Sequence, residues 1–319
     1  MSSEATTPPK RLRTAVIGCG YLGRFHAQKY AALDHCDLVA VVDSDRTRAE
    51  EVAQECHTRA VFDFRQLFGQ VDAVSVVVPT QYHFAVAKEV LQQGIHLLLE
   101  KPMTVTVAEA DILIDLARKR QLVLQIGHLE RFNSAVLALH DLLQQPKFIE
   151  SHRLAPFNPR GADVNVILDL MIHDIDIIHH LVQSPVAKID ANGVAVLTSE
   201  IDIANARITF DNGAVANVTA SRVSTKAQRK MRIFQPESYI AIDFQEKKLS
   251  LHRTGEGEMY PGIANIVSEE HNFANSDAIL AEIEAFLNAI RNGTAPAVSG
   301  QDGRDALATA IRISELLQS

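Results

Sequence analysis

The stretch Thr14-Ala-Val-Ile-Gly-Cys-Gly-Tyr-Leu-Gly23 decides the fold of this chain. A strand-like apolar run leads directly into three glycines at the spacing of a dinucleotide-binding turn. The first glycine makes the tight turn, the second lets the backbone approach a pyrophosphate, and the third lets the following helix pack close to the sheet. The N-terminus of that helix offers free N–H groups to the phosphates. We therefore expect the cofactor to contact Gly18, Gly20, Tyr21, Leu22 and Gly23.

An aspartate defines which dinucleotide is expected. Asp43 ends the next apolar run, Leu38–Val42, and lies 20 residues beyond Gly23. A carboxylate at this place accepts hydrogen bonds from the adenosine ribose hydroxyls, and it repels a 2′-phosphate. The sequence therefore predicts NAD and not NADP as the cofactor.

The N-terminal part of the chain alternates strand and helix patterns. Continuous apolar runs are typical of parallel strands that are buried on both faces. We predict a Rossmann domain over residues 11–127, after a polar tail over residues 1–10. Its strands are expected at Thr14–Ile17, Leu38–Val42, Ala73–Val78, His96–Leu99 and Leu122–Ile126, with helices at Phe84–Gln93 and Ala108–Arg120.

The pattern changes after Gly127. Residues 128–319 are expected to form an α+β domain for substrate binding and oligomerisation, with an open, mostly antiparallel sheet. The turn Asp211-Asn-Gly213 between two strand-like runs indicates a hairpin. Helices are expected at Phe132–Gln144, Asn165–Val182, Asp277–Arg291 and Gln301–Leu317, and strands at Phe148–Leu154, Ile203–Phe210, Ala214–Ala220, Lys230–Phe234 and Tyr239–Asp243.

Composition excludes several classes of protein. The formal net charge of −8 argues against a general nucleic-acid or anionic-membrane surface. No segment approaches the ~20 apolar residues of a membrane span, and the N-terminal tail has no apolar core of a signal peptide. Cys19, Cys36 and Cys56 are an odd number without metal-type spacing, which indicates reduced thiols in the cytoplasm.

Lys101 is the first candidate catalytic residue. The motif Glu100-Lys-Pro102 follows an apolar strand, so Lys101 is expected at the carboxyl end of a parallel strand, where open α/β sheets bind ligands. A lysine beside a nicotinamide can donate to the substrate oxygen and stabilise developing negative charge. The alternative interpretation is a solvated lysine in a turn. Thr80, His83 and Glu100 complete the residues that we expect around the cofactor, together with Lys101.

A polar stripe along an apolar helix gives the second cluster. Asp169, His173, Asp176 and His180 recur at helical intervals within residues 165–182, so they are expected to share one face. Polar groups in so apolar a helix are hydrogen-bonded or functional. We favour function for Asp169 and His173, and a core or surface role for His179 and His180. A metal held by Asp169 and His173 is a third possibility, but no further ligand lies at a characteristic spacing, so no metal is expected.

These separated motifs resemble the glucose–fructose oxidoreductase / inositol dehydrogenase (Gfo/Idh/MocA) family, and the resemblance spans most of the chain. It implies a Rossmann domain followed by an α/β domain whose open sheet packs into homodimers or homotetramers. The family's motif lysine matches Lys101, and its aspartate and histidine match Asp169 and His173. It also places a substrate- or nicotinamide-side residue near position 128, which makes His128 a further candidate.

Three looser segments, over residues 127–133, 153–161 and 169–176, look most like the family members that oxidise the C3 hydroxyl of UDP-N-acetylglucosamine. That resemblance implies a 3-keto sugar nucleotide passed to a PLP-dependent aminotransferase in lipid A diamino-sugar synthesis. Arg131, Arg153 and Arg160 are candidates for substrate binding, together with His128, Asp169 and His173. Of these, Arg153 and Arg160 could bind the diphosphate, because arginine binds such a group bidentately. The alternative for Arg153 and Arg160 is a pair of surface salt bridges.

Three functional hypotheses follow. The first is the NAD-dependent UDP-sugar 3-dehydrogenase, with His173 accepting the hydroxyl proton, Asp169 orienting it and Lys101 stabilising the oxygen. Spacing does not decide whether Lys101 or His173 is the principal base. The second is a dehydrogenase of a free polyol such as inositol, and the third is a non-catalytic NAD-sensing or scaffold protein.

Overall fold

The computed structural model describes residues 11–140, 142–158, 164–273 and 276–318. The chain divides into two compact units. The first comprises the residues up to Gly127 together with Ile279–Gly300, and the second comprises His128–Ala278 and Gln301–Ser319. The division at Gly127 lies where the sequence pattern changes. However, the second unit is not continuous over 128–319, because one late helix belongs to the first unit.

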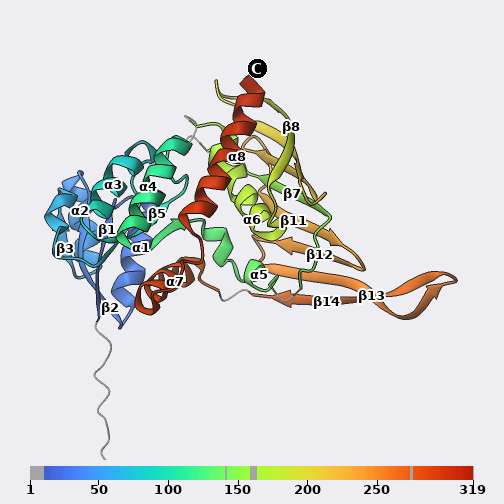
Figure 1. The fold of residues 1–319 in the computed structure, drawn as a ribbon, viewed down its shortest axis with the longest axis horizontal. Helices are drawn as coiled ribbons and strands as arrows, with labels where there is room; N and C mark the ends of the chain where they lie inside the picture. Colours follow the sequence, from blue (N-terminus) through green and yellow to red (C-terminus); the bar gives the residue numbers. More distant parts are fainter. Residues whose placement is uncertain (1–10, 141, 159–163, 274–275, 319) are drawn as a thin grey trace, which may run out of the picture. The chain divides into compact units, whose positions relative to one another are not determined.

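The first unit contains a six-stranded, fully parallel sheet (Figure 1). Its strand order is β3-β2-β1-β4-β5-β6, so the order reverses between β1 and β4. Ligands bind open α/β sheets at such a reversal, beyond the carboxyl ends of the strands. The strands are β1 (Leu12–Ile17), β2 (Cys36–Val42), β3 (Arg59–Val61), β4 (Ala73–Val76), β5 (His96–Glu100) and β6 (Leu124–Gly127).

Helices flank this sheet. Thr106 and Glu109 form a reciprocal capping box at the start of α4, which satisfies two backbone N–H groups there. The helices are α1 (Tyr21–Ala32), α2 (Arg46–Glu55), α3 (His83–Gln92), α4 (Val107–Arg120) and α7 (Ala278–Asn292), with short 3₁₀ turns at Phe64–Leu67 and Thr80–Tyr82.

Helix α7 completes the core of the first unit. Ile283, Phe286 and Leu287 are fully buried in a cluster that also contains Val16 of β1 and Tyr30 of α1. The sequence correctly predicts this helix but not its unit, since its apolar stripe does not specify which sheet it covers.

The second unit contains an eight-stranded mixed sheet. Its order is β14-β13-β12-β11-β7-β10-β9-β8, and every pair is antiparallel except β7–β10. Gly213, with φ +82°, turns the chain between β9 and β10 as the Asp-Asn-Gly signal predicts. The strands are β7 (Phe148–Leu154), β8 (Val186–Val194), β9 (Ile203–Phe210), β10 (Val215–Ser221), β11 (Gln228–Gln235), β12 (Ser238–Asp243), β13 (Lys248–Tyr260) and β14 (Ile263–Asn272).

One face of this sheet carries helices, and no described helix covers the other, which we call the open face (Figure 1). Residues along β7 alternate strictly between buried and half-buried, as expected for a sheet that is covered on one side. The covering elements are α5 (Ser134–Leu137), a π-helical turn (Ile167–Met171), α6 (Ile172–Val182) and α8 (Gly300–Gln318), after a 3₁₀ turn at Leu129–Phe132 (Figure 1).

The predicted helix over Phe132–Gln144 is wrong in its extent. Of the residues described in this range, only Ser134–Leu137 is α-helical, and turns follow it. Ala135, Val136 and Leu139 nevertheless reach the core, so the apolar spacing is satisfied by packing without a continuous helix. Among the described residues, no helix is long and apolar enough to cross a membrane.

Candidate functional site

The glycine turn after β1 has the geometry of a dinucleotide loop. Gly18 has φ +102°, a conformation that side chains rarely adopt, and a Cβ there would collide with the carbonyl of Val77. A Cβ on Gly23 would collide with the carbonyl oxygen of Gly18. Both positions therefore require glycine for the turn itself.

The second glycine has room in front of it. A Cβ at Gly20 would meet no protein atom within 4 Å, and Gly20 is the N-cap of α1. The N-terminus of α1 therefore faces open space, as phosphate binding requires. Tyr21 is exposed and Leu22 is half-buried at this helix start.

Asp43 is fixed beside this turn at the end of β2. Its Oδ2 accepts the backbone N–H of Cys19 at 2.8 Å, and its Oδ1 accepts that of Asp45 at 2.9 Å. Arg48 lies 3.5 Å from the same carboxylate. The carboxylate is thus held next to the glycine turn, where a ribose of the cofactor is expected.

The remaining cofactor candidates follow β4 and β5. Thr80 is half-buried in the 3₁₀ turn after β4. His83 is buried, and its ring nitrogens lie 2.9 and 2.8 Å from the carbonyl oxygens of Pro102 and Val78. Burial lowers the pKa of His83, although these carbonyl groups oppose the shift, so the neutral ring donates to one of them. The imidazole thereby joins the segments that follow β4 and β5, and the contact of His83 with the cofactor stays a prediction.

Lys101 lies at the carboxyl end of β5, as predicted. It is half-buried, its backbone N–H donates to Glu100 Oε2 at 3.2 Å, and the Lys101–Pro102 peptide is cis. The motif therefore combines a side chain near the ligand-binding edge of the sheet with a backbone that Glu100 holds.

Asp169 and His173 lie in the second unit, where a π-helical turn leads into α6. Asp169 is within this turn and His173 is at the start of the helix, and both are half-buried. Asn165 Oδ1 accepts the N–H of Leu168 and caps the turn. A π-helical turn widens the spacing of the residues that it carries, and such turns are frequent at functional sites. Asp169 and His173 are therefore not in the regular helical register that the sequence predicts.

A buried ion-pair network anchors α6 to β7. Arg153 Nε and Nη2 donate to Asp174 at 2.7 and 3.2 Å, and Nη1 donates to Glu130 at 2.8 Å. Ser151 also donates to Asp174, at 3.0 Å. Burial alone would lower the pKa of Arg153, but the two carboxylates raise it, so the guanidinium stays charged. Asp174 follows His173 directly, so this network fixes the turn of α6 that contains the candidate catalytic histidine.

A second buried cluster accounts for the remaining aspartate of the stripe. Asp176 accepts a hydrogen bond from Arg131 Nε at 2.9 Å, and Arg131 Nη2 lies 3.3 Å from Asp302. His128 Nδ1 is 4.0 Å from Asp176, and its side chain is buried. Three of these residues, His128, Arg131 and Asp176, come together as the start of the second unit packs against α6.

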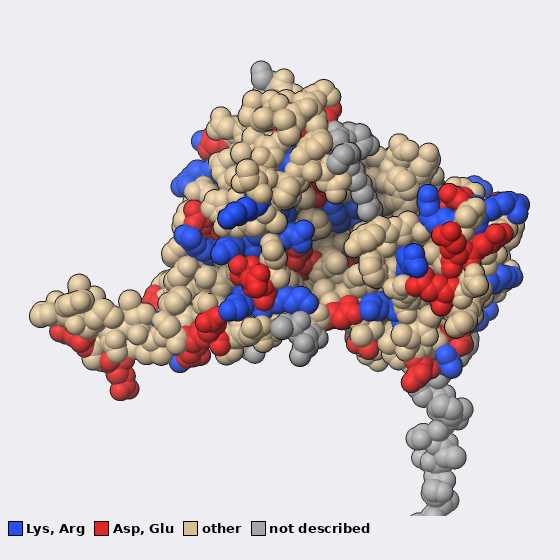
Figure 2. Space-filling model, turned by 180° about the vertical axis from the view of Figure 1, so that it is seen from behind, with Lys and Arg blue, Asp and Glu red and all other residues tan. Residues whose placement is uncertain are grey.

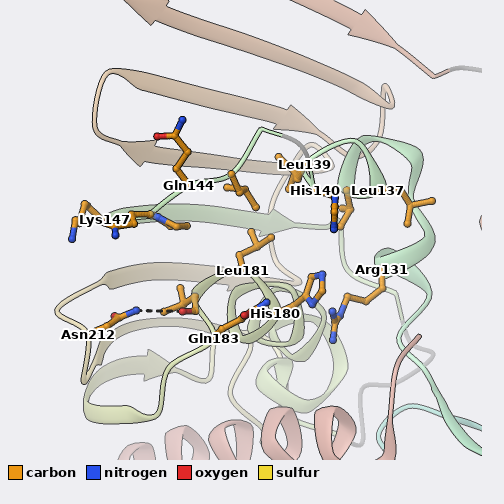
Figure 3. Close-up of a pocket in the computed structure, with 15 residues that line it drawn as sticks. Arg131, Leu137, Leu139, His140, Gln144, Lys147, His180, Leu181, Gln183 and Asn212 are labelled. Atoms are coloured by element: carbon orange, nitrogen blue, oxygen red, sulfur yellow. Dashed lines mark hydrogen bonds between the residues drawn. The ribbon is translucent and has the colours of Figure 1, made fainter. Parts of the chain in front are cut away.

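The two following histidines agree with the simpler interpretation. His179 Nε2 lies 2.8 Å from Thr309 Oγ1, and the ring packs edge-on to Phe210. His180 is exposed and lines a cavity of about 540 Å³, in which its ring lies near the Arg131 guanidinium (Figure 3). Neither Asp169 nor His173 lines this cavity.

Sequence reasoning misses Asp174 and Glu130. Both are buried or nearly so and hold Arg153. The available signal is an acid next to the motif histidine in an otherwise apolar helix, since such an acid requires a buried cationic partner.

Arg160 lies outside the described residues. On the face of the molecule in Figure 2, acidic and basic side chains are interspersed, as on an ordinary solvated surface.

The glycine turn, the fixed carboxylate of Asp43 and the open space at Gly20 fit a bound NAD. Residues 12–128 match the oxidoreductase family GFO_IDH_MocA with its NAD-binding Rossmann fold, and residues 145–240 match the GFO/IDH/MocA C-terminal domain. The chain belongs to this family of NAD-binding oxidoreductases.

Individual relatives show which members of the family the chain resembles. The chain is 45% identical to a UDP-N-acetylglucosamine 3-dehydrogenase of Acidithiobacillus ferrooxidans, over 95% of this chain and 96% of that protein. A solved structure of this dehydrogenase has a TM-score of 0.90 and 43% identity, covering 97% and 98% of the two chains. A myo-inositol 2-dehydrogenase of Thermotoga maritima is 24% identical over 93% of each chain. A scyllo-inositol dehydrogenase of Lactobacillus casei, solved with NAD(H) and scyllo-inositol, shares the fold at a TM-score of 0.79 and 20% identity.

Proposed function

We propose that this protein oxidises the C3 hydroxyl of UDP-N-acetylglucosamine with NAD and forms the 3-keto sugar nucleotide. The observation that carries this proposal is the 45% identity, over nearly the full length, to a UDP-N-acetylglucosamine 3-dehydrogenase. Lys101, Asp169 and His173 support a catalytic function, because they supply a cation and an acid–base pair of the kind that alcohol oxidation needs.

Each candidate catalytic residue has its own role in the proposed oxidation. Bound NAD supplies the hydride acceptor. His173 accepts the hydroxyl proton at an imidazole nitrogen, and Asp169 orients the ring and stabilises the charge that it gains. The Lys101 ammonium group donates a hydrogen bond to the substrate oxygen and stabilises the negative charge that develops there. The Arg153 network fixes the turn of α6 that contains His173.

The arginines fall into two groups. Arg131 and Arg153 already donate to buried carboxylates. We therefore propose that they shape the substrate site through Asp176, Asp174 and Glu130, and that Arg160 supplies the direct contact to the diphosphate.

A single-turnover assay tests the proposal. Enzyme and NAD are mixed in equal amounts, and UDP-N-acetylglucosamine, N-acetylglucosamine or myo-inositol is added while the absorbance of reduced nicotinamide is recorded. A stoichiometric burst with the nucleotide sugar alone supports the proposal. A burst with a free polyol instead identifies an inositol-type dehydrogenase, and NAD binding without any burst favours the sensor hypothesis.

The product defines the next step. A 3-keto sugar nucleotide is a substrate for a PLP-dependent aminotransferase, so we propose that the protein supplies one during lipid A diamino-sugar synthesis. We also propose a cytoplasmic location, which suits a nucleotide-sugar substrate and three buried, free thiols.

The open sheet face supports a homodimer or homotetramer. Phe148, Phe234, Tyr239 and His252 are directly paired across β7, β11, β12 and β13 and form a stacked row with ring centroids 4.9–5.6 Å apart. All four are half-buried and belong to the face opposite the helices. Such a row is a suitable contact surface for the same row in a second copy.

A further inference from the structure

Three buried ionisable side chains meet in the first unit next to the Lys101 turn. His26 of α1, Glu100 of β5 and Glu282 of α7 are 1%, 8% and 0% exposed. One side-chain ligand atom of each lies within 4.8 Å of those of the other two. The proposed mechanism uses Lys101 but gives Glu282 no role.

Two of these residues are well bound. His26 Nε2 lies 3.4 Å from Glu100 Oε1, and His26 Nδ1 lies 3.2 Å from Ser75 Oγ, which in turn is 2.9 Å from the Tyr30 hydroxyl. The other oxygen of Glu100 accepts the backbone N–H of Lys101. Glu100 therefore joins a buried histidine to the turn that carries the candidate catalytic lysine.

Glu282 differs from both. Neither of its carboxyl oxygens has a hydrogen-bond partner among the described residues, although both are buried. Gln125 of β6 donates to the backbone carbonyl of Glu282 at 3.0 Å, and its own Oε1 is buried without a partner. The carboxyl group thus faces His26 and Tyr30 of α1 and Glu100 of β5, while Gln125 of β6 holds the backbone of the same residue.

The surroundings shift the pKa values of the two carboxyl groups in opposite directions. Burial, and then the negative charge of Glu100, raises the pKa of Glu282 well above its ordinary value of 4.5. Burial also acts to raise the pKa of Glu100, but the contacts with His26 and Lys101 lower it. Two carboxylates this close in a buried site cannot both ionise easily, so one keeps a proton. The directions of the two shifts favour Glu282 as the group that keeps it.

We propose that Glu282 is a positioning residue, which holds a proton so that Glu100 alone carries the negative charge of this cluster and keeps its bonds to His26 and the Lys101 backbone. Ionised Glu282 would repel Glu100 and displace the end of β5. A neutral Glu282 instead adds no second negative charge beside Glu100. Residues from the two ends of the first unit thereby set the geometry of the Lys101 turn.

Replacing Glu282 by a neutral residue of the same shape tests whether its carboxyl group is protonated. Glu282→Gln keeps the shape and cannot ionise, whereas Glu282→Ala removes the group. We expect Glu282→Gln to retain kcat within about twofold and Glu282→Ala to lower kcat about 10- to 100-fold, with little change in KM. Glu284→Gln is the matched control on the same helix, and it should leave kcat unchanged. A Glu282→Gln variant as impaired as Glu282→Ala would overturn the proposal.

Two further measurements do not depend on activity. Because the folded-state pKa of Glu282 is raised, the stabilisation from its bound proton is complete below pH 4.5 and is lost as the pH rises through the folded-state value. The melting temperature of the wild type should therefore fall relative to that of Glu282→Gln across this interval. The infrared carbonyl band of a neutral carboxylic acid should be present at neutral pH in the wild type and absent from Glu282→Gln.

A bound cation would neutralise the same cluster in a different way. His and carboxylate ligands suit divalent metals, so the purified wild-type protein is also analysed for metal content. Parallel melting curves for the two proteins, or a stoichiometric divalent metal that Glu282→Gln loses, would exclude the protonated carboxyl group.

Discussion

At the scale of single residues, His173 carries the proposed proton transfer. Replacing it by asparagine keeps the size and polarity but removes the base, so we expect kcat to fall about 10²- to 10⁴-fold. NAD binding, measured by calorimetry, should stay unchanged because His173 is outside the Rossmann unit.

His180→Asn is the matched control for this substitution. His180 is exposed on the same helix, seven residues further along, and lines the separate cavity of Figure 3. Its replacement should leave kcat within about twofold of the wild type, since exposed substitutions away from a site are close to neutral. Equal losses in both variants would show that the helix, not the imidazole, is what activity needs.

Asp43 sets cofactor choice at the same scale. In Asp43→Ser, the carboxylate no longer repels a 2′-phosphate, and Arg48, which lies 3.5 Å from Asp43, becomes available to bind one. We expect kcat/KM for NAD to fall about 10- to 100-fold and that for NADP to rise, in accordance with the energy of a charged hydrogen bond. Asp37→Ser on the same strand should not change the ratio of the two kcat/KM values, and an unchanged ratio in Asp43→Ser would contradict the assigned role.

At the scale of elements, the attachment of α6 to β7 is the most vulnerable contact of the proposed site. Arg153→Met leaves Asp174 and Glu130 buried without their cation. We expect a loss of about 3–5 kcal/mol in the free energy of unfolding. Arg232→Met breaks an exposed ion pair between β11 and Glu150 of β7, and it should cost about 1 kcal/mol or less.

Denaturant titrations of Arg153→Met and Arg232→Met compare their free energies of unfolding. Repeating the titrations at different pH values tests the contribution of Glu130. Burial alone would raise the pKa of Glu130, but Arg153 lowers it below the ordinary range. The stabilisation from Glu130 is therefore complete above its ordinary pKa and is lost as the pH falls through the folded-state value. Arg153→Met should lack this acidic decline, and a variant that keeps it would assign the decline to another carboxylate.

The elements also show why some patterns are easier to read than others. β7 and β9 have the predicted bounds, because each has one buried face and alternates accordingly. β14 escapes prediction because almost all of its residues are exposed, so no face is marked by apolar side chains. The π-helical turn at Asp169 leaves no mark in the apolar spacing, yet it changes how Asp169 and His173 are presented.

At the scale of the whole molecule, the aromatic row on the open sheet predicts the oligomeric state. Phe234→Glu places a charge in the middle of the stacked row, so we expect a shift to a smaller species in light scattering coupled to size-exclusion chromatography. Gln92→Glu adds the same charge at an exposed position of α3 and should leave the mass unchanged. An unchanged mass for Phe234→Glu would show that another surface joins the subunits.

The sequence predicts the residues of the cofactor-binding unit better than it predicts the contacts between distant segments that complete this unit. Local patterns predict the positions of Gly18, Asp43 and Lys101, because the carboxyl ends of the strands in a parallel sheet meet at one edge. The buried partners of Arg153 and the surroundings of Glu282 depend on contacts between distant segments, which no local spacing records. The unit to which α7 belongs is hidden for the same reason.

The place of α7 has a consequence for the order of synthesis. The strands and early helices of the first unit leave the ribosome long before α7, which supplies Ile283, Phe286 and Leu287 to their core. Until α7 has been made, the nascent Rossmann sheet therefore has an unfilled apolar face, while the sheet of the second unit can already pair its strands. The cofactor-binding unit begins first and is completed only after the strands of the second unit have been synthesised.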